Sequence, residues 1–347
     1  MDISNYKDYL INIAKDILRA HSPSAYTPRI TAVMKKAAAE TGTEIKITNK
    51  GTFVLSLPGK SSKMKIGLAA HCDTLGAMVR SLRDDGGVNF IKVGGPLMCT
   101  LDGEYCTLIT RDEKEYTGTF LSLSPSVHVF SDASTRERNP ENMYVRLDVN
   151  EKTAAELRSL GIEKGNYICI DPKTVVTDSG YIKSRFLDDK ISVACILTAV
   201  RIMKDQGIVP RYDTEIIFTM YEEVGHGASS VPEGIGEMLA VDMGCVGSDL
   251  ECTEKQVSVC VADSNGPYNY ELTNRLISLC KKHGINFAAD IYPHYGSDIR
   301  AALVSGNDIK GALIGSGVHA SHGMERTHID GLVNTIKLII AFLTENE

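Results

Sequence analysis

The spacing of apolar residues near the start of the chain predicts two helices followed by a hairpin. A first helix is indicated by apolar residues that share one helical face: Leu10, Ile13, Ala14, Ile17 and Leu18. Ser22-Pro23 ends it, and Thr27-Pro28 begins a second helix with a cap residue and a proline in the first turn. Residues 43–57 then alternate around Asn49-Lys50-Gly51, which predicts two short antiparallel strands.

Buried strands and helices alternate in two further parts of the chain. An apolar run from Lys65 to Ala70 leads into His71, and a second run from Glu215 to Met220 leads into Tyr221. Between them, a helix follows Asp188-Asp189, with an apolar face formed by Val193, Ile196, Leu197 and Val200. The alternation continues to a final helix at residues 328–343, so these parts predict an α/β fold with a central mixed sheet.

The pattern changes between residues 78 and 177. Short β-like runs are separated by Gly, Pro and charged turns, at residues 88–93, 106–109, 117–123, 144–147 and 167–170. One helix is predicted there, beginning at the capping box Thr153-Ala154-Ala155-Glu156 and ending at Gly161. We expect a β-rich domain at 78–177 inserted into a catalytic domain of residues 1–77 and 178–347, because a hundred residues of loop would be implausible.

Composition narrows the class of protein. The 347 residues are 43% hydrophobic, and a net charge of -7 is spread without a basic stripe, which argues against nucleic acid as a partner. The first residues lack a signal-peptide pattern, and no apolar run approaches membrane-spanning length. Nine cysteines without a CxxC pair suit a reducing compartment, so we expect a cytoplasmic protein with no membrane partner.

Candidate metal ligands lie where the predicted strands end. Five short segments, four of which follow an apolar run, supply them: His71-Cys72-Asp73, Asp188-Asp189, Glu222-Glu223, Asp242 and His322. Ligands bind at the carboxyl edge of open α/β sheets, so we expect these side chains to gather there. Together they are typical of a two-metal hydrolase.

Hydrolysing an amide at neutral pH needs a nucleophile, a polarised carbonyl and a proton shuttle. Two divalent ions supply the first two, and a neighbouring carboxylate supplies the third. Glu222 can act as general base and acid while Glu223 faces a metal. Imidazole mixed with carboxylate favours zinc or cobalt over magnesium, and Asp73 can accept the second ring N–H of His71.

These motifs, in this order, resemble the family of glutamyl, deblocking and tetrahedral (TET-type) aminopeptidases. The likeness covers nearly the whole chain and includes His-x-Asp, Asp-Asp, Glu-Glu-Val-Gly, Asp-x-Gly and a late histidine. It implies that Asp188 bridges two ions, that His71 and Asp242 complete one site, and that Glu223 and His322 complete the other.

The resemblance also implies an architecture. Family members have an α/β catalytic domain interrupted by a β-barrel-like or PDZ-like domain, which is used in homo-oligomer formation, commonly in a twelve-subunit tetrahedral shell. Four positions depart from the usual pattern without removing a proposed ligand: Thr74, Lys190, Tyr221 and His226.

The late histidine has three candidates. His319, His322 and His328 all lie before the last helix, and His322 aligns best because Glu325-Arg326 follow it. His319 remains the alternative ligand.

Three functions are compatible with these residues. The first is an aminopeptidase acting on peptides, whose substrate ammonium group would be held by carboxylates such as Glu222 or Asp298. The second is a dimetal deacylase or amidase acting on N-acyl amino acids or dipeptides. That group usually carries a ferredoxin-like inserted domain with two amphipathic helices, and residues 78–177 predict only one helix. A non-catalytic binding or assembly protein is the third, and it would be expected to have lost a ligand or the base.

Overall fold

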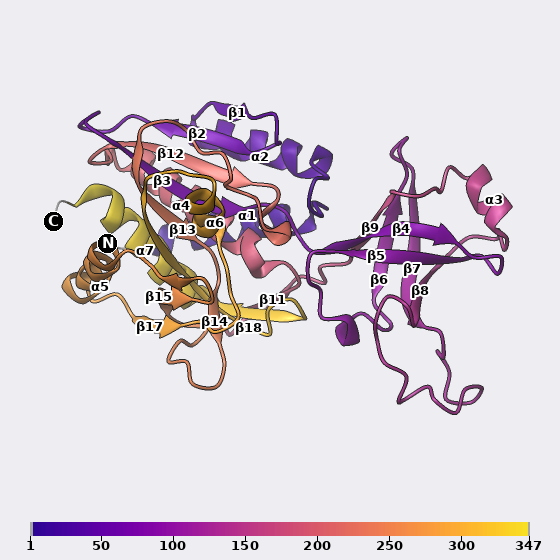
Figure 1. Cartoon of the computed structure of the whole chain (residues 1–347). Helices are drawn as coiled ribbons and strands as arrows, with labels where there is room; N and C mark the ends of the chain where they lie inside the picture. The colour runs from indigo at the N-terminus through magenta and orange to yellow at the C-terminus, as the bar shows by residue number, and fades with distance from the viewer. Residues whose placement is uncertain (1–2, 346–347) are drawn as a thin grey trace. The chain divides into compact units, whose positions relative to one another are not determined.

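The computed structural model describes residues 3–345, and this part of the chain divides into two units (Figure 1). One unit combines the chain up to Asp73 with the chain from Lys173 onward, and the other is Thr74–Pro172. The predicted boundaries at 77/78 and 177/178 therefore lie four and five residues beyond those of the structure. Positions 1–2 and 346–347 of the predicted ranges lie outside the described residues.

A mixed sheet forms the centre of the first unit. Its strands in spatial order are β1 (Ile45–Ile47), β2 (Phe53–Leu57), β12 (Asp213–Thr219), β3 (Lys65–His71), β13 (Ile235–Val241), β18 (Lys310–His319), β19 (Glu325–His328), β11 (Tyr181–Ser184) and β10 (Val175–Val176). Four further strands join it: β14 (Gly244–Val246) and β15 (Val257–Asp263) pair with β18, and β16 (Gly266–Pro267) and β17 (Phe287–Ile291) pair with β15. The predicted hairpin of β1 and β2 and the predicted strand β3 are confirmed.

The central strands run parallel to one another. β3 pairs in parallel with both β12 and β13, and β13 pairs in parallel with β18. The burial of β3 extends over all but its first residue, as expected for a strand covered on both faces. The predicted central mixed sheet is confirmed.

Helices cover this sheet. They are α1 (Lys7–Arg19), α2 (Pro28–Thr41), α4 (Leu187–Asp205), α5 (Tyr270–His283), α6 (Asp298–Val304) and α7 (Ile329–Thr344), with short 3-10 turns η1 (Ser4–Tyr6) and η3 (Glu222–Val224). α4 packs on β3, β13 and β18 and is itself contacted by α1, α2 and α7. All but three of its residues are buried, which makes it the centre of the helical layer. Across residues 3–345, no helix is both long and apolar enough to cross a membrane.

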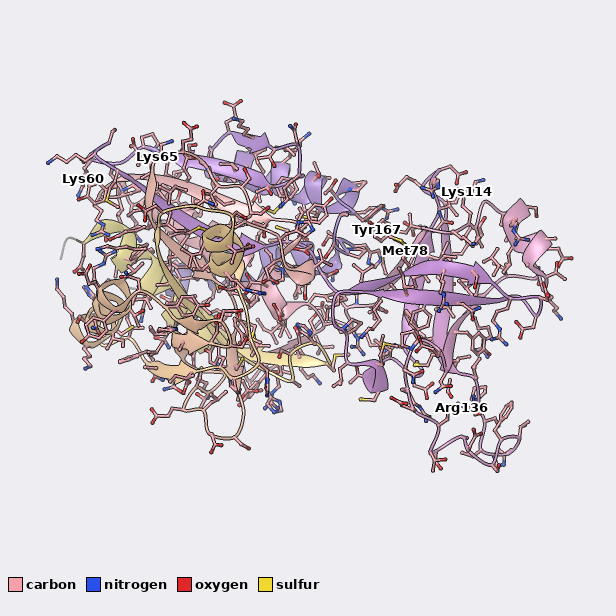
Figure 2. The ribbon with its side chains drawn as sticks, viewed as in Figure 1. Lys60, Lys65, Met78, Lys114, Arg136 and Tyr167 are labelled. Carbon is pink, nitrogen blue, oxygen red and sulfur yellow. The ribbon has the colours of Figure 1, made fainter. Side chains whose placement is uncertain are left out.

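The second unit is a closed barrel of six strands. Their order is β4 (Gly76–Leu82), β5 (Gly87–Val93), β8 (Met143–Leu147), β7 (Glu115–Ser122), β6 (Tyr105–Ile109) and β9 (Tyr167–Ile170). The barrel closes where β9 pairs with β4, with Met78 opposite Tyr167 (Figure 2). Phe90 and Phe120 meet edge to face inside it, with ring centroids 5.1 Å apart.

Two short helical segments accompany these strands, η2 (Met98–Thr100) and α3 (Ala154–Ser159). The capping box predicted at Thr153 is formed, because its hydroxyl accepts the N–H of Glu156 while the Glu156 carboxylate accepts the N–H of Thr153. A closed barrel with one short α-helix agrees with the predicted β-barrel-like insertion. It differs from a ferredoxin-like domain with two amphipathic helices.

Candidate metal centre

The carboxyl ends of four parallel strands bring the candidate ligands to one edge of the sheet. His71 is the last residue of β3, and Asp242 directly follows β13. Glu222 begins the turn η3 just beyond β12, and β18 ends three residues before His322. Because these strands are parallel neighbours, residues as far apart in the sequence as His71 and His322 meet here.

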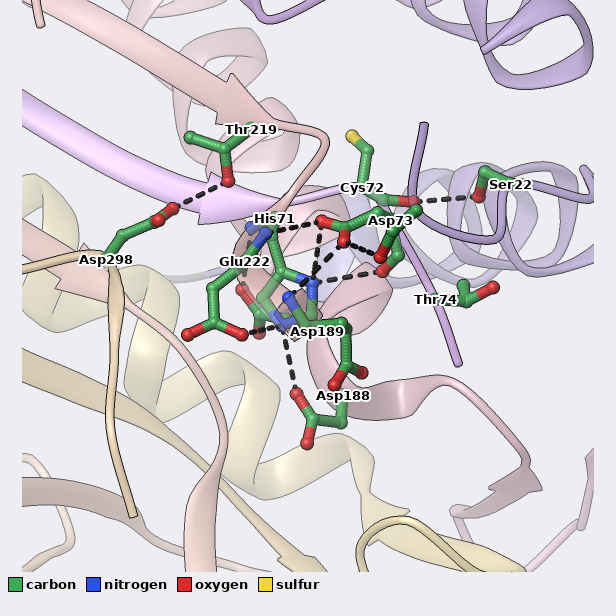
Figure 3. A network of polar contacts seen from close by, with 12 residues as sticks. Ser22, His71, Cys72, Asp73, Thr74, Asp188, Asp189, Thr219, Glu222 and Asp298 are labelled. Carbon is green, nitrogen blue, oxygen red and sulfur yellow. Dashed lines mark hydrogen bonds and ion pairs between the residues drawn. The ribbon is translucent and has the colours of Figure 1, made fainter. Parts of the chain in front are cut away.

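Asp188 lies between two imidazole rings. One of its carboxylate oxygens, Oδ1, is 3.1 Å from Nε2 of His71 (Figure 3). The other, Oδ2, is 3.4 Å from Nε2 of His322, and that nitrogen is also 3.7 Å from Oε2 of Glu223. The two oxygens of Asp188 therefore face different partners, as a carboxylate shared between two sites requires.

Among residues 3–345, two groups of side chains have the spacing of metal ligands. His71, Asp188 and Glu223 form one, and His71, Asp189 and Asp242 form the other, each with its ligand atoms within 4.8 Å of one another. Asp189 directly follows Asp188 in the predicted Asp-Asp motif, and its residue type and position alone predicted no separate role for it. In the structure it is fully buried, and its Oδ2 accepts the backbone N–H of His71 at 3.2 Å.

The Asp73 carboxylate has partners other than the predicted one. The ring Nδ1 of His71 lies 3.0 Å from the backbone carbonyl of Asp73 and 3.6 Å from its carboxylate, so the carbonyl is the nearer partner of the ring and the carboxylate stays within ion-pair distance. The carboxylate also accepts the Ser24 hydroxyl at 2.5 Å and the backbone N–H groups of Glu222 and Glu223 at 3.1 and 3.3 Å. Asp73 thus fixes the turn that carries the two glutamates.

The loop after this turn is held from two sides. Asp298 accepts the Thr219 hydroxyl at 2.6 Å and the backbone N–H of Ala228 at 2.7 Å, while Lys50 donates to the carbonyl of Gly227 at 3.0 Å. Asp298 is buried, and both of its oxygens are engaged. The sequence had suggested that Asp298 binds a substrate ammonium group, but these contacts make its carboxylate unavailable for that role.

Burial among like charges shifts the pKa values of the site. Burial, reinforced by neighbouring carboxylates, raises the pKa of Glu222 and Glu223 well above the ordinary value, and that of Asp242 to about 7. Burial alone would lower the pKa of His71, but the hydrogen bond to Asp188 and the surrounding carboxylates raise it well above its ordinary value. Burial would raise the pKa of Asp188, but its hydrogen bonds to the two histidine rings lower it.

The donor set suits divalent cations. Buried carboxylates outnumber the cationic groups that face them, and such a cluster is costly unless positive charge compensates it. Within the described part of the chain, Oε1 of Glu223 is buried without a hydrogen-bond partner. Imidazole nitrogen and carboxylate oxygen are the ligands that zinc-like ions accept, so these residues fit a metal site.

The three candidate late histidines have different surroundings. His322 reaches the carboxylate cluster, and its side chain keeps 39% of its surface exposed. His319 ends β18 and is exposed. His328 caps the last helix, with its ring nitrogens engaged by the N–H of Asp330 and the carbonyl of Ser179. The geometry therefore favours His322.

Comparisons of the sequence with a family model and with a curated protein point to the same family. The sequence matches the family described as M42 glutamyl aminopeptidase over residues 51–338. A Bacillus subtilis (strain 168) protein named "Putative aminopeptidase YhfE" is 40% identical over 334 residues, which cover 96% of this chain and 96% of that protein.

Solved structures share the fold. A TET aminopeptidase from Thaumarchaeota archaeon SCGC AB-539-E09 superposes with a TM-score of 0.88 at 19% identity, covering 98% of each chain. The Pyrococcus horikoshii TET1 peptidase superposes with a TM-score of 0.85 at 20% identity, covering 97% of this chain and 100% of that one. At these identities the likeness concerns the fold, and the family assignment comes from the sequence. The chain belongs to the M42 glutamyl aminopeptidase family and is a metal-dependent aminopeptidase.

Proposed function

We propose that this enzyme removes amino-terminal residues from peptides with two divalent ions held at the sheet edge. The observation that carries the proposal is the position of Asp188, whose two oxygens face His71 and His322 at 3.1 and 3.4 Å. Asp188 would touch both ions, with His71 and Asp242 completing one site and Glu223 and His322 the other. Asp189, beside Asp242 and His71, is a further candidate ligand.

When bound, the two ions supply Lewis acidity for the scissile carbonyl and lower the pKa of a water molecule. Zinc or cobalt suits the mixed nitrogen and oxygen donors better than magnesium does. The protein's contribution is to hold these donors in fixed positions within a buried setting.

Glu222 is the proposed proton carrier. It lies outside both groups with metal-ligand spacing, and its side chain keeps 17% of its surface exposed, so a substrate can reach it. Its Oε2 lies 3.8 Å from Nε2 of His71, within the cluster, and Asp73 fixes its backbone N–H. In the proposed mechanism, the carboxylate accepts a proton from water at Oε and then donates it to the nitrogen of the departing amine.

The barrel unit is the proposed site of subunit association. The Pyrococcus horikoshii TET1 peptidase is described as assembling into a tetrahedron or a large octahedral shell, and it covers this chain almost completely. We infer a homo-oligomer, with a dodecamer as the expected form, in the cytoplasm. Peptides are the proposed partners, with neither nucleic acid nor membrane.

One experiment tests both the base and the substrate class. Wild-type protein and Glu222→Gln are stripped of metal, reloaded with Co²⁺ or Zn²⁺, and assayed on aminoacyl chromogenic substrates with free or acetylated amino groups. Glu222→Gln should keep its bound metal but lose about 10²–10⁴-fold in kcat, because an amide cannot accept the proton.

The same assay distinguishes aminopeptidase from deacylase. A free ammonium group can form charge-assisted hydrogen bonds worth about 1.5–3 kcal/mol each, which an acetylated amine cannot, so acetylation should reduce hydrolysis tens-fold or more. Near wild-type turnover by Glu222→Gln would remove it from the mechanism, and release of acetate from the acetylated series, in place of the chromophore, would assign the deacylase activity instead.

A further inference from the structure

Glu325 joins two of the proposed metal ligands through their backbones. It is the first residue of β19 and only 1% of its surface is exposed. Its Oε1 accepts the backbone N–H of His322 at 3.0 Å, and its Oε2 accepts the backbone N–H of Asp188 at 3.1 Å. One side chain thus ties together two segments that lie 137 and three residues away from it in the sequence.

The surrounding fold makes this contact specific. β19 pairs with β11 in antiparallel register, with Glu325 opposite Ser184, so the chain that leads from β11 to Asp188 passes beside it. On the other side, His322 adopts a left-handed conformation with φ of 62°, which a histidine rarely adopts without support. The hydrogen bond from its N–H to Glu325 provides that support.

We propose that Glu325 is a positioning residue that sets the separation between Asp188 and His322 and thereby the geometry of the two metal positions. This inference rests on the proposed two-metal function and assigns a role to a residue outside the ligand set. Glu325 would touch neither metal nor substrate. It would act by holding the backbones of two ligands at a fixed distance.

The chemistry of the carboxylate gives a sharp test. Both oxygens accept an N–H, so the position needs two acceptors. Glutamine at this position keeps the shape but has one acceptor and one NH₂ donor, and the donor would face a backbone N–H. Aspartate keeps two acceptors and the charge but is one methylene shorter, so it cannot span both donors. Glu325→Asp therefore separates the effect of charge from the effect of the two-point contact.

Asp290 offers a matched control. It is 5% exposed, and its two oxygens accept the backbone N–H groups of Glu251 and Cys252 at 2.8 and 3.0 Å. Asp290→Asn therefore makes the same change, one acceptor replaced by an NH₂ donor, at an equivalent pair of buried contacts in a segment that carries none of the proposed ligands. A general loss of stability would appear in Asp290→Asn as well as in Glu325→Gln.

The experiment titrates the metal-free full-length proteins with Co²⁺ and records both affinity and the visible absorption spectrum of the bound ion, with thermal unfolding in parallel. Glu325→Gln and Glu325→Asp should each bind Co²⁺ about 10–100-fold more weakly and with an altered spectrum, as expected when a residue that orients ligands is changed. Asp290→Asn should lower the melting temperature but keep the affinity within about twofold of wild type.

Several outcomes would overturn the inference. Unchanged Co²⁺ affinity and spectrum in either Glu325 variant would do so, as would an equal loss of affinity in Asp290→Asn. Restoration of wild-type binding by Glu325→Asp would show that charge alone matters. Failure of the two-metal proposal would appear separately, as binding of fewer than two ions by the wild-type protein or as turnover by Glu222→Gln.

Discussion

Gly227 gives a direct test of how the loop beyond the catalytic turn is held. A Cβ atom at this position would lie 2.2 Å from Oδ1 of Asp298 and 2.8 Å from Oγ1 of Thr219. Neither atom can withdraw freely, because the same carboxylate accepts the Thr219 hydroxyl at 2.6 Å and the N–H of Ala228 at 2.7 Å. In Gly227→Ala, either the loop or Asp298 must therefore move.

The expected loss of stability in Gly227→Ala can be calculated from the hydrogen bond that is lost. A hydrogen bond to a charged group contributes about 1.5–3 kcal/mol, so loss of one bond to Asp298 should reduce stability by that amount. At about 2–4 °C for each kcal/mol, the melting temperature should fall by roughly 3–12 °C. The loop continues from the turn that bears Glu222, and a displacement of about 1 Å at a catalytic group can cost about 10²-fold in kcat.

Gly247→Ala is the matched control. A Cβ at Gly247 meets no atom within 4 Å, and its backbone, like that of Gly227, lies outside the left-handed region. Thermal unfolding of the metal-loaded proteins and hydrolysis of an unblocked aminoacyl chromogenic substrate compare the two variants. If Gly227→Ala matched Gly247→Ala in both melting temperature and kcat, the assigned contact with Asp298 would be refuted.

Three further predictions follow from the site and the domain organisation. Asp188→Ala should lose both ions together while His322→Ala weakens mainly one, because Asp188 turns one carboxylate oxygen to each histidine ring; elemental analysis showing two ions in Asp188→Ala would contradict this. The pKa of Asp242 is about 7 in the folded protein without metal, against about 3.9 in an unfolded chain, so the folded state retains the proton. The EDTA-treated protein should therefore become less stable as the pH rises through 7, and a melting temperature that increases over this range would oppose the assignment. Replacing Thr74–Pro172 with a short linker should leave a dissociated catalytic unit, and light scattering that still detected a large assembly would place association elsewhere.

The sequence predicted the parts of the site that depend on strand ends. Apolar runs predict that β3 and β12 are buried, and the charged residues that directly follow these runs are unusual next to a buried strand. Because parallel strands share one carboxyl edge, their order along the chain was enough to gather His71, Glu222 and Asp242 without knowledge of the sheet order.

The sequence could not predict contacts made to backbone N–H groups. Asp73 and Glu325 both accept backbone N–H groups of other residues. Almost every residue type has a backbone N–H, so such a contact cannot be recognised from the sequence. For the same reason Asp73 was assigned to the His71 ring, since a side chain two residues away is the partner that spacing alone suggests. The predicted boundary after residue 77 falls inside strand β4, whose residues 76–82 pair within the barrel.

The order of segments along the chain also determines when each unit can form during synthesis. The barrel is built from one continuous stretch, Thr74–Pro172, so all its strands are available once that stretch has emerged from the ribosome. Strand β3, in contrast, pairs with β12, which begins only at Asp213. At about 5–20 residues per second, β3 waits roughly 7–30 s for this neighbour. Throughout that interval an apolar strand that lies in the middle of the finished sheet has both edges unpaired, which makes the nascent catalytic unit more prone to aggregation than the barrel.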